Sequence, residues 1–377
     1  MTRAAGRGLV LFFTYRVSLA TWAARGLLDR EVELYRRLLP ALGPVTFVTY
    51  GGPDDRGLGA PLAGIRVLPN RWGLPAPLMS LLAPLLYRRE IGEAAVLKTN
   101  QASGAWTAVL AKWLTGRPLL VRCGYVWSVN HARESRSAWR SRLVFRLERA
   151  ALRAADRVAV TSEAAREYLL GAHGLDPARV LVVPNHVDTE RFAPRPDAAR
   201  EPGLVGFVGR LAPEKNVESL VRAAAGVPGA RLIVAGDGPL RPALTALARE
   251  RGLAAEFPGA IPNERLPALL GRLSVFVLPS RYEWSPKSLL EAMAAGVPVL
   301  AADVPGIRDL VRHGETGWLV SGDPEALRVG LACLLGDAAL RGRLGEAGRR
   351  HVLLHHATER VVERERSLLL ALASGTR

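Results

Sequence analysis

Arg210 and Lys215 are spaced so that both could hold the phosphates of a ligand. They lie in the segment FVGRLAPEKN, residues 207–216, after an apolar run that predicts a strand ending at Gly209. A helix is predicted to begin near Asn216, a residue type that suits the N-cap. Two cations beside a helix N-terminus suit a diphosphate. A solvated loop could contain the same residues, so this pair alone leaves both interpretations open.

Two carboxylates further along the chain, Glu283 and Glu291, could face one small cleft. Glu283 follows a predicted strand, and Glu291 falls in the second turn of a helix predicted to start at Ser285 and Pro286. Carboxylate oxygens accept hydrogen bonds from vicinal sugar hydroxyls, and the helix dipole favours phosphate. An exposed pair is the alternative. Glu291 lies in the apolar run LLEAMAA, where an unpaired carboxylate would be costly, which favours a functional role.

The glycines of VAGDGP, residues 234–239, predict a tight turn after a strand. Gly236 and Gly238 would let the backbone approach a ligand there. The spacing does not match the G-x-G-x-x-G pattern of a dinucleotide site. An oxidoreductase is therefore disfavoured.

The elements that must position these residues follow from alternating apolar runs and amphipathic helical patterns. This alternation predicts parallel sheets with helices on both faces, and it restarts once, so we expect two doubly wound α/β domains. Strands of the first are expected at residues 9–13, 45–50, 64–69, 95–99, 118–123, 157–162 and 179–185. Strands of the second are expected at residues 203–210, 230–238, 256–261, 275–280, 298–303 and 317–320. In such folds ligands bind at the carboxyl ends of the strands.

Helices are expected between these strands, and a Pro-rich, charged segment at residues 188–203 marks the domain boundary. The helical patterns cover residues 29–42, 104–116, 141–155, 216–226, 239–252, 263–273 and 285–296, and parts of 323–373. We predict a first domain over residues 1–190, a linker at 191–203 and a second domain over 204–355. Residues 356–377 are expected to form a C-terminal helix that packs back on the first domain.

The chain of 377 residues carries a net charge of +16, from 51 Lys and Arg against 35 Asp and Glu. An anionic membrane surface and a merely Arg-rich composition both explain this charge, whereas nucleic acid is disfavoured because no binding motif is present. The apolar segment 72–90 ends in Arg88 and Arg89. It is either a helix packed in the core or cleft, or an interfacial element with its arginines at the headgroups.

Metal, disulfide and membrane-spanning features are not expected. The two cysteines, Cys123 and Cys333, are far apart and the histidines are scattered, so we predict no metal site and a reducing cytoplasm. Residues 9–15 resemble the apolar part of a signal peptide, but Arg16 interrupts the run and a buried strand is the favoured interpretation. No run approaches the ~20 apolar residues of a spanning helix.

Together, these motifs resemble the C-terminal domain of the retaining glycosyltransferases of family four, which have the GT-B fold. The resemblance covers residues 204–320, through the Gly-Arg loop, GDGP, the glutamate pair, EAMAAGVPV and DVPGIRDLVRHGETGWLV. PNHVDTERF, residues 184–192, is similar to the family's interdomain segment. The resemblance implies two Rossmann-like domains that face each other across a cleft, with the nucleotide-sugar donor held by the C-terminal one.

The resemblance also implies residue roles. Arg210 and Lys215 would neutralise the donor diphosphate, Glu291 would bind the ribose and Glu283 would contact the transferred sugar. Arg210, Lys215 and Glu283 are the expected catalytic residues. Donor contacts are further expected from Gly236, Ile261, Trp284, Ser285, Pro286, Lys287 and Ser288. The family usually retains the anomeric configuration without a metal, so no cofactor is expected beyond the donor itself.

Three departures concern the sugar pocket and the acceptor side. This chain has EWSP at residues 283–286, where the family commonly has EGFG. The family's Gly-Gly loop is replaced by residues 14–31, with Gly26 as the expected flexible point, and no N-terminal histidine is evident. The predicted first domain would bind the acceptor at the strand ends. The candidate residues on that side are Asn100, Gln101, Arg122 and Tyr125.

The sequence thus predicts a retaining, metal-independent hexosyltransferase that uses a UDP- or GDP-sugar. Its expected acceptor is a glycan, a lipid-linked sugar or a polysaccharide precursor, at the inner face of the cell membrane. Two alternatives stay open. A sugar-nucleotide epimerase would need further acid and base carboxylates, and a non-catalytic scaffold would bind the nucleotide sugar alone.

Overall fold

The computed structural model describes residues 8–135, 137–195 and 200–375, and the chain divides into two compact units. The first unit contains the chain up to Pro184 together with Val362–Arg377, and the second contains Asn185–Val361. The second unit thus begins before the linker predicted at 191–203, of which residues 196–199 lie outside the described residues. It also extends past the predicted limit at residue 355, and the final two residues of the predicted C-terminal helix are not described.

The first unit is built on a seven-stranded parallel sheet with the order β3-β2-β1-β4-β5-β6-β7. Every strand lies within a range predicted for it. The chain reverses direction across the sheet between β1 and β4, the switch point at which doubly wound sheets bind ligands. The strands are β1 Leu9–Phe12, β2 Val45–Val48, β3 Ile65–Leu68, β4 Val96–Thr99, β5 Leu119–Cys123, β6 Arg157–Val160 and β7 Val180–Val182.

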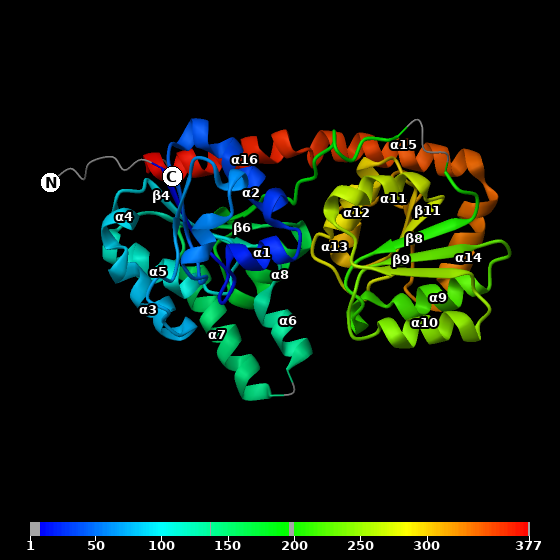
Figure 1. Ribbon diagram of the computed structural model, residues 1–377, viewed down its shortest axis with the longest axis horizontal. Coiled ribbons are helices and arrows are strands. Elements are labelled where there is room, and N and C mark those ends of the chain that lie inside the picture. The colour runs from blue at the N-terminus through cyan, green and yellow to red at the C-terminus, as the bar shows by residue number, and fades with distance from the viewer. Residues whose placement is uncertain (1–7, 136, 196–199, 376–377) are drawn as a thin grey trace. The chain divides into compact units, whose positions relative to one another are not determined.

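Helices connect these strands and cover both faces of the sheet (Figure 1). They are α1 Leu19–Ala24, α2 Leu28–Leu42, α3 Ala76–Leu86, α4 Arg88–Gly92, α5 Ala105–Thr115, α6 Trp127–Glu134, α7 Ala138–Ala154 and α8 Glu163–His173, with 3-10 turns η1 Pro53–Gly57, η2 Ala60–Leu62 and η3 Pro177–Arg179. Segment 72–90 is largely helical, and α3 is only partly buried. Met79 and Ala83 lie in the core, whereas Leu81 and Leu85 are more than half exposed.

A buried carboxylate fixes the segment that follows β1. Asp55 is 1% exposed and accepts hydrogen bonds from the backbone N–H groups of Leu19 and Ala20 at 3.1 and 3.0 Å, and from the Thr49 hydroxyl at 2.7 Å. The first N–H groups of a helix have no partner within it, and the helix dipole favours an anion there. Asp55 therefore anchors α1 in the place where the family's Gly-Gly loop was not found.

The second unit contains a six-stranded parallel sheet with the order β10-β9-β8-β11-β12-β13. Its strands lie within the predicted ranges, except that β10 begins one residue earlier. They are β8 Leu204–Val208, β9 Arg231–Ala235, β10 Ala255–Gly259, β11 Val275–Leu278, β12 Val299–Ala302 and β13 Trp318–Val320. Its helices are α9 Val217–Ala225, α10 Arg241–Glu250, α11 Leu266–Arg272, α12 Lys287–Ala294, α13 Pro305–Arg308, α14 Pro324–Gly336, α15 Ala338–His355 and the start of α16 Thr358–Ser374, with 3-10 turns η4 Pro213–Lys215 and η5 Asn263–Arg265.

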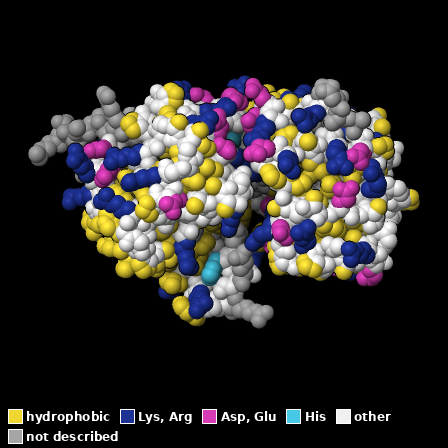
Figure 2. All heavy atoms as spheres, in the orientation of Figure 1, with side chains coloured by type: hydrophobic (Ala, Val, Ile, Leu, Met, Phe, Trp, Pro, Cys, Tyr) yellow, Lys and Arg dark blue, Asp and Glu magenta, His cyan; other side chains and the backbone are white. Residues whose placement is uncertain are grey.

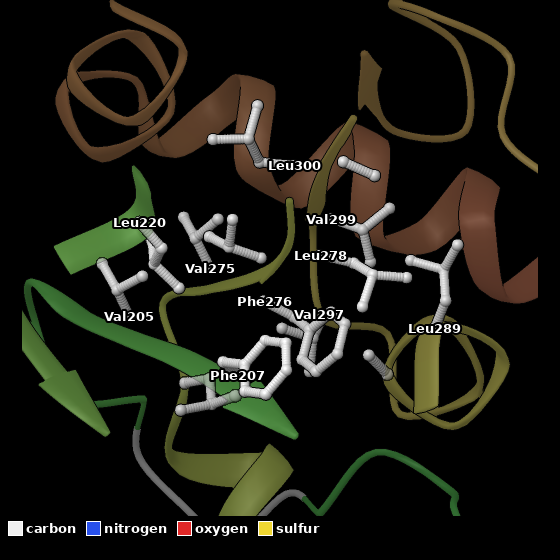
Figure 3. Packing of buried hydrophobic residues seen from close by; sticks show 14 of the residues in the cluster. Val205, Phe207, Leu220, Val275, Phe276, Leu278, Leu289, Val297, Val299 and Leu300 are labelled. Atoms are coloured by element: carbon white, nitrogen blue, oxygen red, sulfur yellow. The ribbon is translucent and has the colours of Figure 1, made fainter. Parts of the chain in front are cut away.

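The core of the second unit lies between this sheet and its helices. Figure 3 shows Phe207 of β8 and Phe276 of β11 among valine and leucine side chains, and neither phenylalanine is exposed. Burying one such side chain contributes about 1.5–3 kcal/mol. Because β8 and β11 are central strands buried on both faces, their sequences read as continuous apolar runs. That property made them recognisable in the sequence.

A buried ion pair joins the C-terminal helix to the sheet of the first unit. The Lys98 ammonium on β4 donates to Glu365 on α16 and to the Tyr35 hydroxyl at 3.0 Å. Arg122 on β5 lies 3.7 Å from the same carboxylate. Burial disfavours the charged form of Lys98, but Glu365 and Tyr35 together outweigh that cost and the pKa of Lys98 lies above its ordinary value. Within the first unit, α16 therefore packs on the sheet through a buried group of opposite charges.

No helix among the residues that the structure describes is long and apolar enough to cross a membrane.

Removing Glu365 should destabilise the protein more than removing Lys98. Glu365→Leu would leave both Lys98 and Arg122 without their carboxylate, so we expect a loss of about 3–5 kcal/mol in the unfolding free energy of the first unit. Lys98→Met should cost less, because Arg122 still faces Glu365. The double variant should recover only the part of the loss that is due to Lys98, because Arg122 still lacks its carboxylate. Urea unfolding measures all three.

A small effect would contradict this role of the ion pair. If Glu365→Leu costs less than about 1 kcal/mol, the range of exposed pairs, the contact does not hold α16 in place.

Candidate functional site

Three loops meet at the carboxyl edge of the sheet in the second unit. They are the β8 loop (residues 209–216), the β9 loop (236–240) and the β11 loop (279–286). The backbone N–H of Leu211 donates to the Asp237 carbonyl at 2.9 Å, and that of Arg281 donates to the Glu214 carbonyl at 2.9 Å. The β8 loop is therefore bonded to both of the others, and the predicted phosphate and sugar residues lie on one connected framework.

Two glycines of the β9 loop allow this framework to form. Gly236 has φ +145°, and a Cβ there would lie 1.8 Å from the Gly209 carbonyl oxygen. Gly238 has φ +155°, and its Cβ would lie 2.4 Å from the Leu211 carbonyl oxygen. Any side chain would push the loops apart. The two glycines of GDGP therefore pack against the β8 loop. The contact of Gly236 with a ligand stays a prediction.

The site contains an ion pair between two of the predicted catalytic residues. The Lys215 Nζ donates to Glu283 Oε1 at 2.5 Å, and the Ser280 hydroxyl donates to the same oxygen at 2.8 Å. The two charged side chains are 22% and 11% exposed. Although 68 residues separate them, the parallel sheet brings the ends of β8 and β11 side by side. An ammonium and a carboxylate are thus held in contact at the carboxyl edge of the sheet.

Arg210, the third predicted catalytic residue, is more exposed. Its guanidinium pairs with Glu214 at 2.5 Å, and its side chain is 61% exposed whereas that of Glu214 is 16% exposed. An exposed ion pair contributes little stability, so a ligand phosphate could replace Glu214 at small cost. Arg210 and Lys215 therefore differ, since Lys215 is fixed in the site and Arg210 lies at its rim.

The β8 loop ends in Asn216, which the structure places at the N-cap of α9. Its side chain does not cap the helix, contrary to the expectation. Its amide instead donates to the carbonyls of Pro279 at 3.1 Å and Gly322 at 2.7 Å. Its φ is +54°, a left-handed conformation that asparagine tolerates better than most residues. Asn216 thus bonds the β8 loop to the β11 loop.

Glu291 lies on α12 and is 5% exposed, so it is not the exposed surface glutamate considered as its alternative. The side-chain amide of Asn263 donates to it at 3.4 Å. Asn263 follows shortly after Ile261, the predicted base contact, so the loop after β10 and the carboxylate lie together. Glu291 is the deepest carboxylate of the predicted donor set.

The start of α12 corrects one prediction. The helix begins at Lys287, and Pro286 occupies the N-cap without a side-chain cap bond, so Ser285 is not the N-cap. The Ser285 carbonyl instead accepts a hydrogen bond from the Asn185 side chain at 2.8 Å. Trp284 and Ser285 therefore precede the helix, whereas Lys287 and Ser288 form its first turn.

Three residues that the sequence analysis did not select hold this turn in place. Asn185 bonds the Ser285 carbonyl, and the Asn185 carbonyl in turn lies 3.0 Å from His356 Nδ1. A Cβ on Gly306 would lie 2.2 Å from the Glu283 carbonyl oxygen, so only glycine lets α13 approach. Only weak sequence features pointed to these residues, since Asn185 lies in the segment PNHVDTERF and Gly306 follows a proline.

A neutral histidine lies next to this support. Burial, followed by the neighbouring histidines, lowers the pKa of His351 to about 4, and its ring is 5.7 Å from that of His356. His351 is therefore uncharged at neutral pH and adds no repulsion at the junction of α15 and α16.

The predicted acceptor residues gather at the carboxyl edge of the first unit's sheet. The Asn100 amide donates to the Thr14 hydroxyl at 3.1 Å, and the Gln101 carbonyl oxygen accepts from the Gly124 N–H at 2.8 Å. Tyr125 follows directly after Gly124. Arg122 is different, because its guanidinium faces the buried Glu365 and the residue is 9% exposed. Its geometry is that of a core ion pair, and its contact with an acceptor stays a prediction.

Within residues 8–135, 137–195 and 200–375, no group of three or more His, Cys, Asp or Glu side chains is arranged to hold a metal ion.

Protein-family models match both halves of the chain. Residues 32–191 match the model described as Glycosyltransferase Family 4, and residues 188–351 match the one described as Glycosyl transferases group 1. The matches overlap at residues 188–191, close to the division between the two units.

Two curated relatives match parts of the chain. A 2-deoxystreptamine N-acetyl-D-glucosaminyltransferase of Streptomyces fradiae is 37% identical over 204 residues, which are 49% of this chain and 48% of that protein. The sulfoquinovosyl transferase SQD2 of Arabidopsis thaliana is 29% identical over 324 residues, 81% of this chain and 62% of that protein. The chain thus matches about half to three fifths of the length of these relatives.

Solved structures share the fold over nearly the whole chain. Sucrose-phosphate synthase of Thermosynechococcus elongatus superposes with a TM-score of 0.82 at 24% identity, covering 98% of this chain and all (100%) of that one. The Anabaena protein HepE, solved in complex with UDP, gives 0.77 at 19% identity, with coverages of 97% and 100%. These likenesses show the GT-B fold. Because glycosyltransferase family models also match from residue 32 to residue 351, the chain belongs to the group 1 glycosyltransferases of family four.

Proposed function

We propose that the protein transfers a sugar from a nucleotide-sugar donor, with retention of configuration, and that its second unit holds the donor. The observation that carries the proposal is the Lys215–Glu283 pair at the carboxyl edge of the sheet, followed along the chain by the buried Glu291 of α12. These three side chains match the parts of a nucleoside diphosphate sugar: Lys215 would bind the diphosphate, Glu283 the sugar and Glu291 the ribose. The relatives named above are glycosyltransferases, which supports the same activity.

In the proposed complex the donor diphosphate shares the Lys215 ammonium with Glu283, and Arg210 turns from Glu214 to the phosphates. The bond from the sugar C1 to the diphosphate oxygen breaks, and the acceptor hydroxyl oxygen bonds to C1 with the same configuration. The hydroxyl proton ends on the released nucleoside diphosphate. Positive charge fixed beside the leaving oxygen stabilises the transition state without rearrangement, and in many enzymes such stabilisation contributes most of the rate enhancement. No metal is required by this scheme.

Uracil is the base that the comparisons favour, because HepE binds UDP on the same fold. For the acceptor side we propose Asn100, Gln101 and Tyr125, which lie at the strand ends of the first unit. A glycan, a lipid-linked sugar or a polysaccharide precursor at the cytoplasmic face of the membrane remains the proposed acceptor.

The first test is a thermal-shift screen of the full chain against UDP, GDP, ADP and CMP, with EDTA or with magnesium. A ligand that binds only the folded protein raises its melting temperature. At a ligand concentration of a hundred times Kd, the gain in unfolding free energy is about 2.7 kcal/mol. We expect one nucleoside diphosphate to act selectively and equally well in EDTA. A shift that appears only with magnesium would refute metal independence, and no shift with any nucleotide would refute the donor site.

Lys215→Met should separate phosphate binding from base binding. Loss of a charge-assisted hydrogen bond costs about 1.5–3 kcal/mol, so the nucleoside diphosphate selected by the screen should bind about 10–100-fold more weakly. Its nucleoside, which has no phosphate, should bind unchanged in calorimetry. Lys112→Met is the matched control, since Lys112 pairs with Asp156 at 2.7 Å in the other unit. Equal weakening of nucleoside and diphosphate would contradict the assignment.

Glu291→Gln should weaken the nucleoside as well as the diphosphate. The amide keeps the size of the carboxylate but loses the charge that accepts two hydroxyl hydrogen bonds, so we expect about a tenfold loss of affinity for both. Glu264→Gln is the control, because that exposed residue adjoins Asn263. Unaltered nucleoside affinity in Glu291→Gln, with the melting temperature of the free protein preserved, would show that Glu291 does not bind the ribose.

A further inference from the structure

Helix α7 of the first unit carries an apolar stripe that is exposed to solvent. Trp139, Leu143 and Leu147 recur at four-residue intervals, which places them along one side of the helix. They are 64%, 48% and 41% exposed. Other apolar positions of α7 supply its contacts with the core, because Val144, Ala151 and Leu152 are buried. The exposed stripe is thus surplus to the packing of the fold.

An arginine stripe adjoins the apolar one on the same helix. Arg142, Arg146 and Arg149 line a cavity of about 600 Å³ between α6, α7 and α8, together with Arg133, Phe145 and Tyr168. No acidic residue lines this cavity. In the described part of the chain, no ion pair joins Arg142, Arg146 or Arg149 to a carboxylate, and the buried Nε of Arg149 has no hydrogen-bond partner.

The carboxylate on the same helix is already engaged. Glu148 is fully buried and accepts hydrogen bonds from the backbone N–H groups of Trp127 and Ser128 at 2.7 and 3.2 Å, at the start of α6. It also lies 3.3 Å from His173 Nε2. Its charge is therefore directed into the core, and Arg142, Arg146 and Arg149 keep their charge for an external anion.

Neighbouring helices extend the apolar surface. α5 packs against both α3 and α7, so the three helices form one layer. Leu78, Leu81 and Leu85 of α3 are 47%, 55% and 53% exposed, and Trp113 of α5 is 69% exposed. Figure 2 shows hydrophobic side chains gathered over the region that Figure 1 labels α3, with Lys and Arg beside them. Arg88 and Arg89, both exposed, begin α4, one residue after the end of α3.

We propose that the α3–α5–α7 layer docks on a bilayer that contains anionic phospholipids. The tryptophans and leucines enter the boundary between headgroups and acyl chains, and the arginine-lined cavity receives lipid phosphates. Tryptophan prefers this boundary because its ring is apolar with one polar edge, and arginine binds phosphate through several parallel donors. The inference does not depend on the proposed activity.

Charge selects the bilayer over a second copy of the chain. Two copies joined through this layer would bring their arginine stripes together, and like charges at close range oppose association. An anionic headgroup layer instead attracts each basic residue near it. Nucleic acid is bound through its phosphates and base edges, so it would leave the apolar side chains of the three helices without a contact.

Vesicle sedimentation tests the proposal on the full chain. With vesicles of phosphatidylcholine containing about a third phosphatidylglycerol, we expect strong binding that falls at high salt, and little binding to phosphatidylcholine alone. Arg142→Gln/Arg146→Gln should weaken binding about thirtyfold, because each basic residue near the surface contributes about 1 kcal/mol to the binding free energy. Trp139→Ser/Leu143→Ser and Leu81→Ser/Leu85→Ser should each weaken it at every salt concentration, because they remove buried apolar area.

Matched controls lie in the second unit. Arg249→Gln/Arg251→Gln removes the same charge and Leu353→Ser/Leu354→Ser removes exposed leucines, and both should bind vesicles as the parent does. The substituted side chains lie at the surface, so unchanged melting temperatures are expected and confirm folding. Equal loss in the controls would overturn the proposal, as would equal binding to both vesicle types. A dimer in sedimentation velocity that Trp139→Ser/Leu143→Ser dissolves would assign the layer to a second copy instead.

Discussion

Both units of this protein depend on the constraint that all strands of a parallel sheet end at one edge. Each strand must return through a helix, so its carboxyl end is followed by a loop and then by a helix N-terminus. The rule brings Lys215 and Glu283 into contact across 68 residues, because β8 and β11 are neighbours. Once the loops are collected there, two glycines and one asparagine bond them into a single framework. The chemistry of the site is therefore a consequence of topology.

Buried charge is used in a consistent manner across the fold. Asp55 and Glu148 each accept two backbone N–H groups at the start of a helix, and Glu365 faces Lys98 and Arg122. An isolated buried carboxylate would be costly, but a helix N-terminus supplies donors and a favourable dipole. These carboxylates fix elements that apolar packing alone would leave free to slide. The buried Glu291 differs, since in the proposed complex a ligand hydroxyl donates to it.

Much of the fold could be predicted from the sequence, because strands buried on both faces are apolar runs and their connecting helices are amphipathic. The predicted strands were found, and Lys215 meets Glu283 because the strands that precede them, β8 and β11, are neighbours in the sheet. The ends of elements were less predictable. Ser285 suited an N-cap by type, yet Asn185, a hundred positions away, bonds its carbonyl. Arg122 stood at a strand end like Gln101, but its partner Glu365 comes from the last helix. Such contacts depend on pairs of residues that are distant in the sequence.

Arginines line two cavities of this protein, one in each unit. In one cavity they bond to the protein's own backbone, and in the other they suit an anionic ligand. In the second unit a cavity of about 660 Å³ is lined by Arg200, Arg341 and Arg349. These guanidinium groups donate to backbone carbonyls, as Arg341 does to Leu334 at 2.6 Å near the end of α14. The last carbonyls of a helix lack partners within it, so these arginines complete the fold. Arg142, Arg146 and Arg149 of α7 instead line a cavity without an ion pair in the described chain, and they adjoin exposed tryptophan and leucine. Composition alone could not separate these two uses, because both produce the same net charge.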